Sequence, residues 1–247
     1  MKPSTIRGAG STVAQPHSPR NDSALSFRRW AVILAAGLSG VIVLISIIVE
    51  PVHDAAGARE ILQAYAANDR AQGLHSTLIH YGFALSAPVA YAMVGLVRRQ
   101  GAWIANLAAL LAVLGLSTLP GLVFLDYYDV AVVQTAGLEA AVNAGDAIEK
   151  LPGFAALLVP VFIPAILAVP VATLALWRAR LVAWWIPLVA AAGSLVPNFL
   201  PGPEIVTFSV LAVGGLIVAW ALWRVPVAAW YGTDPSEQLD AARTTQP

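Results

Sequence analysis

The chain contains no cysteine and few charged residues. Without cysteine it can form no disulfide, no thiolate metal site and no cysteine nucleophile. Asp, Glu, Lys and Arg together make up 11% of the 247 residues, whereas a soluble domain carries about 25%. A charge at the centre of a bilayer costs about 2.5–3.5 kcal/mol on insertion scales. The shortage of charge therefore indicates a protein whose solvent is lipid.

What the chain has instead is a series of long apolar runs. Six segments lack all four charged residue types, and each has about the 20 residues that a spanning helix needs: Trp30–Val49, Leu74–Val97, Ala102–Leu125, Leu151–Trp177, Val182–Pro203 and Ile205–Trp223. We predict an all-α fold, a polytopic membrane bundle of six transmembrane helices over residues 29–231. The segments between the runs are too short for a core of their own, which excludes a soluble catalytic domain between them.

The two ends of the chain differ from this bundle in composition. Residues 1–28 are rich in Ser, Pro, Thr, Gly and Arg, and they cannot bury enough apolar surface to offset the entropy of ordering. We therefore expect residues 1–28 to be a disordered tail and residues 232–247 to be a flexible one. A cleaved signal peptide is disfavoured, because the first apolar run is about 20 residues long and ends in Val49-Glu50-Pro51.

The charged residues between the runs are sorted by sign. Lys and Arg accumulate in cytoplasmic loops of membrane proteins. With both termini placed inside, eleven of the fourteen basic residues fall on the cytoplasmic side and ten of the fourteen acidic residues fall outside. All eight Trp fall near the predicted cytoplasmic helix ends, where their amphipathic rings suit the headgroup level. We therefore predict a multi-pass membrane protein with both termini in the cytoplasm.

Two of the outer connections are long enough to contain short helices. In Ala58–Ala67 the apolar residues Ile61, Leu62 and Tyr65 fall on one helical face. Leu138–Ile148 has similar spacing. Both segments read as short extracytoplasmic amphipathic helices that lie on the outer surface or cap the bundle.

One group of polar residues could carry chemistry. Predicted helix ends place five imidazoles and carboxylates at about the same depth on the outer face: His53, His75, His80, Asp126 and Glu204. Such groups are suitable ligands for Zn²⁺ or another divalent metal, and they could also relay protons. Ordinary interfacial residues are the competing interpretation, because charged groups belong at helix ends and His75 and His80 do not share a helical face. No cofactor other than such a metal is expected.

His80 and a group of prolines lie deeper in the predicted spans. His80 is about 9 Å into its helix at 1.5 Å per residue. An unpaired imidazole is costly there, so we expect it to turn into the bundle and pair with Asp126. Pro160 and Pro164 lie one turn apart on one face, which predicts a bend in their helix. Broken helices often line transporter sites, but a kinked packing helix is the favoured interpretation of these prolines.

The segment Ile61–Arg70 resembles a stretch in uncharacterised bacterial multispan membrane proteins, in which a short helix leads into the second span. The resemblance implies a multi-pass bundle in a bacterial cell membrane and no particular activity. Three hypotheses stay open: a small-solute or ion transporter or accessory subunit with an outward polar cavity, a membrane-embedded metal-dependent enzyme, and an interaction scaffold. A non-enzymatic role is favoured. The expected partners are the lipid bilayer and a membrane protein or second copy; no basic patch predicts nucleic-acid binding.

Overall fold

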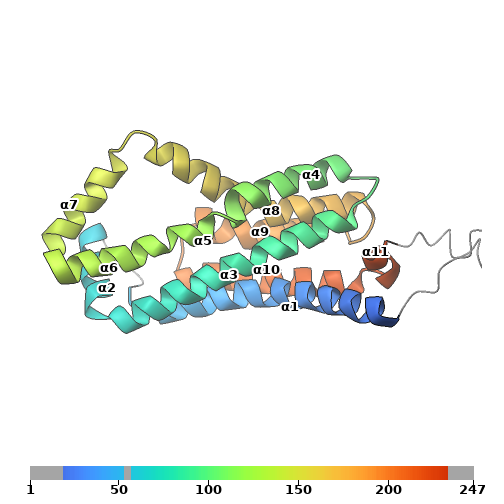
Figure 1. The fold of residues 1–247 in the computed structure, drawn as a ribbon, viewed down its shortest axis with the longest axis horizontal. Helices are drawn as coiled ribbons and strands as arrows, with labels where there is room; N and C mark the ends of the chain where they lie inside the picture. Colours follow the sequence, from blue (N-terminus) through green and yellow to red (C-terminus); the bar gives the residue numbers. More distant parts are fainter. Residues whose placement is uncertain (1–18, 53–56, 233–247) are drawn as a thin grey trace, which may run out of the picture.

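The computed structural model is all-α and describes residues 19–52 and 57–232. Its helices follow the chain as α1 (Pro19–Val49), α2 (Ala58–Ala67), α3 (Asp69–Leu96), α4 (Ala102–Leu111), η1 (Ala112–Leu116), α5 (Leu119–Leu122), α6 (Phe124–Ala136), α7 (Leu138–Glu149), α8 (Phe154–Arg178), α9 (Ile186–Phe199), α10 (Glu204–Arg224) and α11 (Val227–Tyr231). Figure 1 shows the long helices running side by side, with α2, α6 and α7 gathered at one end. The expected all-α class is confirmed.

Four helices in the described part of the chain are long and apolar enough to cross a membrane: Ser23–Val49 within α1, Asp69–Leu96, Phe154–Arg178 and Glu204–Arg224. The remaining two expected spans correspond to shorter apolar helices, Ala102–Leu116 and Ile186–Phe199. At about 1.5 Å per residue, the 14 residues of α9 reach about 21 Å, less than the roughly 30 Å of a bilayer core. The structure thus supports a multi-pass membrane protein with four candidate spans.

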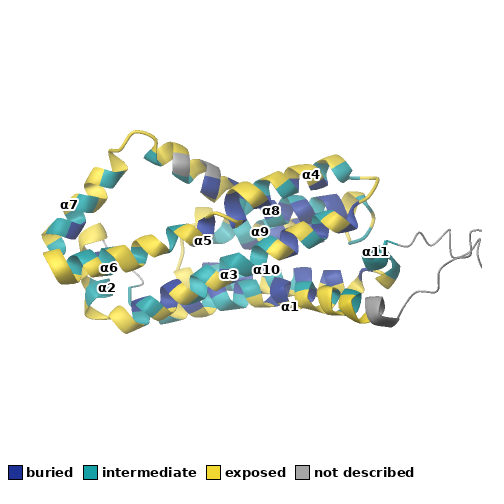
Figure 2. Cartoon of the chain, in the orientation of Figure 1, coloured by how far each residue is buried: buried dark blue, intermediate teal, exposed yellow. Residues whose placement is uncertain are grey.

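Apolar side chains on the outside of the bundle agree with this class. On α1 the exposed residues Leu34, Leu38, Ile45 and Ile48 recur at helical spacing along one stripe. Figure 2 shows exposed positions along the outward faces of the long helices, with buried positions turned inward. A soluble monomer rarely exposes a continuous apolar patch of this extent, whereas lipid is its natural solvent.

The four long helices form a ring together with α4, η1 and α9. Contacts join α1 to α3, α3 to α4 and η1, these to α8, and then α8 to α9, α9 to α10 and α10 back to α1. Close approach of α1 and α10 depends on glycine. A Cβ on Gly40 would lie 2.8 Å from the Leu211 carbonyl oxygen and 2.9 Å from Ala212 Cα, so no larger residue fits without moving the backbone.

The expected third span, Ala102–Leu125, is not one continuous helix. The chain passes from α4 into the π-helix η1, through the short α5 and into α6. The Thr118 hydroxyl donates to the Gly115 carbonyl oxygen at 3.1 Å, which competes with the helical ladder. Pro120 supplies no N–H for that ladder. Gly115 permits η1 to touch the backbone of α8 at Pro164 and Ala165.

The prolines of α8 lie within a helix that is continuous from Phe154 to Arg178. Figure 1 shows the first turns of α8 inclined to the rest of the helix, in the sense that Pro160 and Pro164 predict. The bend falls where α8 meets η1. Two irregular segments therefore face each other in the middle of the bundle.

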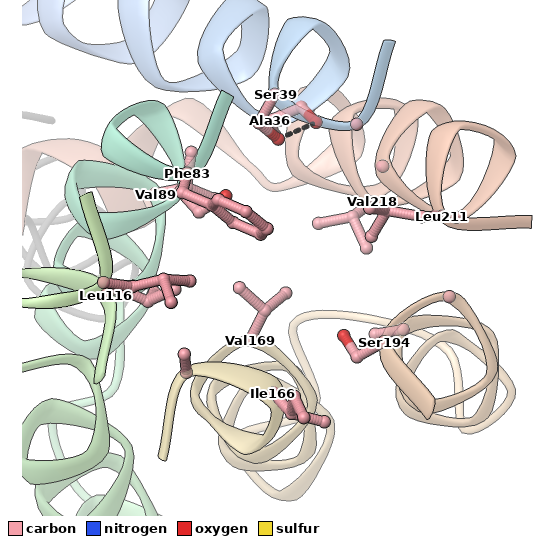
Figure 3. A pocket seen from close by; sticks show the side chains of 18 of the residues that line it. Ala36, Ser39, Phe83, Val89, Leu116, Ile166, Val169, Ser194, Leu211 and Val218 are labelled. Carbon is pink, nitrogen blue, oxygen red and sulfur yellow. Dashed lines mark hydrogen bonds between the residues drawn. The ribbon is translucent and has the colours of Figure 1, made fainter. Parts of the chain in front are cut away.

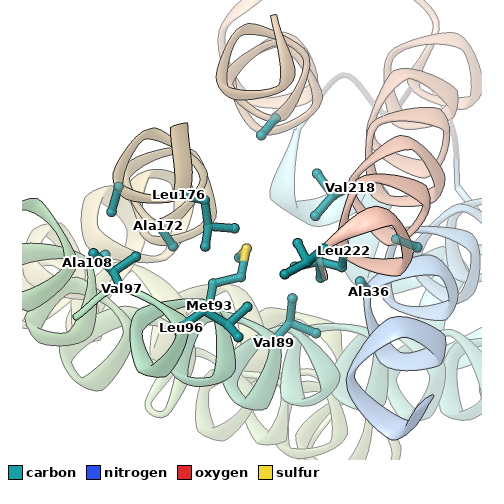
Figure 4. Close-up of a cluster of buried hydrophobic side chains, with 14 of the residues drawn as sticks. Ala36, Val89, Met93, Leu96, Val97, Ala108, Ala172, Leu176, Val218 and Leu222 are labelled. Atoms are coloured by element: carbon teal, nitrogen blue, oxygen red, sulfur yellow. The ribbon is translucent and has the colours of Figure 1, made fainter. Parts of the chain in front are cut away.

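The best-packed part of the bundle lies toward the end that carries α11. Met93 on α3, Leu176 on α8 and Leu222 on α10 are each no more than 1% exposed, and they belong to one cluster. Figure 4 shows these side chains converging from their helices, with Val89 and Val218 beside them. Small residues such as Ala172 bring the helices close enough for this contact.

The opposite end carries the short helices. α2 has the predicted bounds Ala58–Ala67, and α7 ends one residue later than predicted, at Glu149; both are confirmed as helices. The expected connection between Asp126 and Lys150 contains the remainder of α6 as well, with a turn at Gly137, whose φ is 90°. Arg59 on α2 forms a two-pronged ion pair with Glu139 on α7, at 2.5 and 2.9 Å, which joins these helices.

The expected tails lie mostly outside the described residues. α1 begins at Pro19, so residues 19–28 of the tail expected to be disordered are helical. Proline is favoured in the first turn of a helix because its missing N–H has no partner there in any case. Residues 1–18 and 233–247 and the candidate ligand His53 are not described.

Candidate functional site

A buried polar network lies at the end of the bundle that carries α2. The Gln72 side-chain amide donates to the Ser76 hydroxyl at 3.0 Å, and Ser76 donates to Asp126 Oδ2 at 2.9 Å. Gln72 and Ser76 are 2% and 0% exposed. They lie one helical turn apart on α3, and Asp126 lies in the first turn of α6. The network therefore fastens α6 to α3.

Two further bonds extend the network to α1 and α2. His75 Nδ1 lies 2.9 Å from the Ser46 carbonyl oxygen, which can only accept, so Nδ1 carries the proton. The Tyr65 hydroxyl donates to Glu50 Oε1 at 2.9 Å. Both Ser46 and His75 are buried. Four helices thus meet around these groups.

The surroundings shift the pKa of two groups that lie outside the four candidate spans. Burial raises the pKa of the Asp126 carboxyl above its ordinary value, and the Ser76 hydrogen bond and the nearby His75 offset part of that rise. Burial also raises the pKa of the Tyr65 phenol, and the charge of Glu50 and its hydrogen bond raise it further. Tyr65 therefore stays protonated and remains a donor to Glu50.

The structure gathers some of the predicted site residues and separates others. His75 and Asp126 lie together, and Glu204 at the start of α10 is near enough for its charge to act on Tyr65. His80 is half-buried against two rings, with centroids 5.2 Å from Tyr81 and 6.3 Å from Phe124. The histidine whose charge acts on Asp126 is His75. The pairing of His80 with Asp126 stays a prediction.

The described residues contain no group of three or more His, Asp or Glu side chains arranged to hold a metal ion. The candidate His53 lies outside that part of the chain, so the metal hypothesis stays a prediction. The imidazole of His75 and the carboxylate of Asp126 are both engaged by protein partners. As described, the arrangement can anchor four helices to one another.

A cavity of about 290 Å³ lies in the middle of the ring, between the packed cluster and the polar network. Its wall includes residues of α1, α3, η1, α5, α8, α9 and α10, and no charged residue lines it. Figure 3 shows Phe83, Val169, Ser194 and Val218 pointing into it from α3, α8, α9 and α10. The cavity is a hollow between helix faces that are apolar almost throughout.

The few polar groups in the wall are largely engaged by their own helices. The Ser39 hydroxyl donates to the Ala36 carbonyl oxygen at 3.2 Å, and Ser86 donates to Gly82 at 3.4 Å. Such bonds hide a hydroxyl from an apolar environment. The wall therefore offers dispersion contacts rather than hydrogen bonds, and an apolar cavity of this kind excludes water.

Comparison with models of protein families, with curated proteins and with solved structures yields no match in any of the three. The resemblance of Ile61–Arg70 to bacterial multispan proteins is therefore supported only in its coarse form, a helical protein with candidate membrane spans.

Sequence reasoning missed both Gln72 and Ser76 in the network, as well as the cavity. A helical projection of α3 would have placed Gln72, His75 and Ser76 on one face, since they are three and four residues apart. The cavity had a weaker signal in the small residues Gly40, Gly193 and Gly214, which occur on three of its helices. Small residues signal close helix packing as often as they signal space.

Proposed function

We propose that this chain is a multi-pass membrane protein that takes up a small apolar molecule from the bilayer and holds it in its central cavity. The observation that carries the proposal is the charge-free cavity of about 290 Å³ inside a bundle whose outer surface is also apolar. A ligand that dissolves in lipid can reach such a site, and a hydrated ion or charged solute would lose its hydration there without compensation.

Energetics support an occupant. An unfilled cavity costs about 24 cal/mol per Å³ in measured core substitutions, so apolar walls around about 290 Å³ favour an occupant. Native proteins have only about 5–15 kcal/mol of stability in total. A bundle that retains a hollow of this size gives up much of its stability unless something fills the hollow.

The proposal includes a six-span topology with both termini in the cytoplasm. Cationic and aromatic side chains collect at the end of the bundle where α1 begins and α10 ends. Arg224 lies over the rings of Trp220 and Trp223, and Arg29 donates to the Trp223 carbonyl oxygen at 2.8 Å. This arrangement is typical of a cytoplasmic membrane interface. In this topology α4 with η1 and the short α9 would complete the six crossings.

A pair of neighbouring substitutions on α9 tests the proposal. Ser194 points into the cavity, whereas Leu195 is 38% exposed on the outside and is not in the wall. A benzene molecule fills an engineered cavity of about 150 Å³, so the ring of Ser194→Phe should occupy roughly half of this one. Leu195→Phe adds an aromatic ring at the next position without entering the cavity.

Binding of a fluorescent apolar probe to purified protein provides the measurement. We expect the parent and Leu195→Phe to bind the probe with the same affinity, and Ser194→Phe to bind it at least tenfold more weakly while melting at a higher temperature. Equal probe binding by all three proteins, with both variants folded, would show that the cavity is not the site and would overturn the proposal.

A further inference from the structure

The cavity has a mouth at the seam between α8 and α9. Of the residues in its wall, Phe162 on α8 and Asn198 on α9 are the two exposed at the surface of the described chain, Phe162 by 44%. α8 and α9 are in contact. Toward the opposite end of the bundle, the core around Met93 and Leu176 fills the interior. The cavity therefore opens sideways, toward lipid.

The cavity is longest beside α3 and α10. On α3 its wall runs from Ile79 to Val89 and on α10 from Phe208 to Val218. Ten residues on either helix advance about 15 Å at 1.5 Å each. An extended hydrocarbon chain advances about 1.3 Å per carbon, given C–C bonds of about 1.5 Å. A length of about 15 Å thus holds a chain of about twelve carbons.

The volume leads to the same size. A cavity of about 150 Å³ holds the six carbons of benzene, so about 290 Å³ holds about twelve carbons. Length and volume agree only if the cavity is about one chain wide. A fused-ring or branched molecule of the same carbon count would be too short and too broad for it.

The mouth carries one polar side chain that could receive a head group. One N–H of the Asn198 amide donates to the Ser194 carbonyl oxygen at 2.8 Å. An amide has a second N–H and a carbonyl oxygen besides, so Asn198 can exchange hydrogen bonds with a hydroxyl. No charged side chain lines the cavity, so nothing in its wall would pair with an ionised head group.

From this geometry we propose that the occupant is an uncharged single-chain lipid. Its chain of about twelve carbons lies between α3 and α10, and its hydroxyl-bearing head stays at the α8–α9 seam against Asn198. The inference rests on the proposed function and specifies its ligand class. Monoacylglycerols are the matching probes, because they combine one linear chain with a neutral glycerol head.

The first experiment is a chain-length series. Protein is purified in a steroid-based detergent, so that no detergent alkyl chain competes, and its melting temperature is followed by tryptophan fluorescence with monoacylglycerols of eight to sixteen carbons. We expect the largest increase at about twelve carbons in the parent and in Leu195→Phe, and at least a tenfold loss of affinity in Ser194→Phe. The free fatty acid of the same length should bind at least tenfold more weakly.

The second experiment tests the mouth without redesigning the wall. The chain has no cysteine, so Asn198→Cys and Leu195→Cys can each be labelled at a single site after folding with a bulky maleimide. Labelled Asn198→Cys should take up the twelve-carbon probe at least tenfold more slowly than the unlabelled variant. Labelled Leu195→Cys should match its unlabelled form.

Three outcomes would overturn the inference. Equal stabilisation by all chain lengths would contradict the proposed fit of a single twelve-carbon chain. Uptake that is unaffected by the label at Asn198→Cys would contradict the proposed lateral mouth. Binding of compact ring compounds but of no chain would refute the ligand class while leaving the proposed function intact. If neither chains nor compact apolar molecules bind, the proposed function fails together with the inference.

Discussion

The contact between η1 and α8 predicts a large effect for one added methyl group. A Cβ on Gly115 would lie 2.5 Å from Ala165 Cα and 2.6 Å from the Pro164 carbonyl carbon. Carbon atoms pack favourably at about 3.5–4.0 Å, so Gly115→Ala requires a separation of about 1 Å or more. The obstructing atoms are backbone atoms inside a continuous helix and cannot rotate away. The whole of η1 or α8 must move.

The magnitude follows from two opposing terms. Overpacking of a core costs about 1–3 kcal/mol, and rigid backbone on the other side places this case at the upper end. Replacing Gly by Ala in a helix returns about 1 kcal/mol of intrinsic propensity. We therefore expect Gly115→Ala to lose about 2 kcal/mol of stability. Gly95 on α3 has no atom within 4 Å of its would-be Cβ, so Gly95→Ala should gain up to about 1 kcal/mol.

The assay is thermal unfolding in detergent, with the parent and both variants measured side by side. A change of 1 kcal/mol shifts the melting temperature by about 2–4 °C in a domain of 150–250 residues. The two variants should thus differ by about 6–12 °C, with the parent between them. A Gly115→Ala protein that melts at or above the parent would refute the close contact of η1 with α8 and the packing argument built on it.

Three further predictions concern other parts of the bundle. Gly40→Ala should lower the melting temperature by several degrees, because its Cβ would lie 2.8 Å from the backbone of α10. Gly37→Ala is the control, since its Cβ would lie 3.5 Å from its nearest neighbours and should leave the melting temperature unchanged. Equal effects of the two substitutions would contradict the α1–α10 contact. Burial raises the pKa of Asp126, so folding favours its protonated form and stability falls as pH rises from the ordinary carboxyl pKa to the raised one. Asp126→Asn should therefore melt above the parent at pH 7, with the gap narrowing toward pH 3.5, and a constant gap would contradict the raised pKa. For topology, an impermeant thiol reagent on intact cells should label Ala144→Cys and not Ser4→Cys, and the reverse pattern would invert the proposed orientation.

The sequence predicted the helices best where a single physical effect dominates. Charge marks the ends of α3 and α10, so the expected spans Leu74–Val97 and Ile205–Trp223 lie close to the helices observed. The placement of Ile61, Leu62 and Tyr65 on one face predicted α2. In each case the deciding information is local, either the cost of a charge in lipid or a helical repeat.

The break within the expected third span was not predicted, because it depends on distant residues. Gly115, Ser117 and Thr118 are all tolerated in ordinary membrane helices. η1 forms opposite Pro164 and Ala165 of α8, and no local sequence pattern predicts this contact. Because the apolar residues continue to Leu125, the sequence likewise did not predict that a separate helix, α6, begins at Phe124.

The candidate site was predicted in part for a similar reason. His75 and Asp126 were selected because ionisable groups are rare in this chain, and the structure places them in one network. The uncharged members Gln72 and Ser76 carry no such signal, although they make the hydrogen bonds that connect the helices. The cavity depends on how side chains of distant helices pack against one another, and no local sequence pattern predicts that packing.

The order of the layers along the bundle decides how a ligand can reach the cavity. On α3 one face runs from Gln72 and Ser76 in the polar network, through Ile79 and Phe83 in the cavity wall, to Met93 in the packed core. Along α3 the cavity therefore lies between the polar network and the packed core. In the proposed arrangement the seam between α8 and α9 opens to lipid, so a ligand would come from the membrane and, if released, return to it.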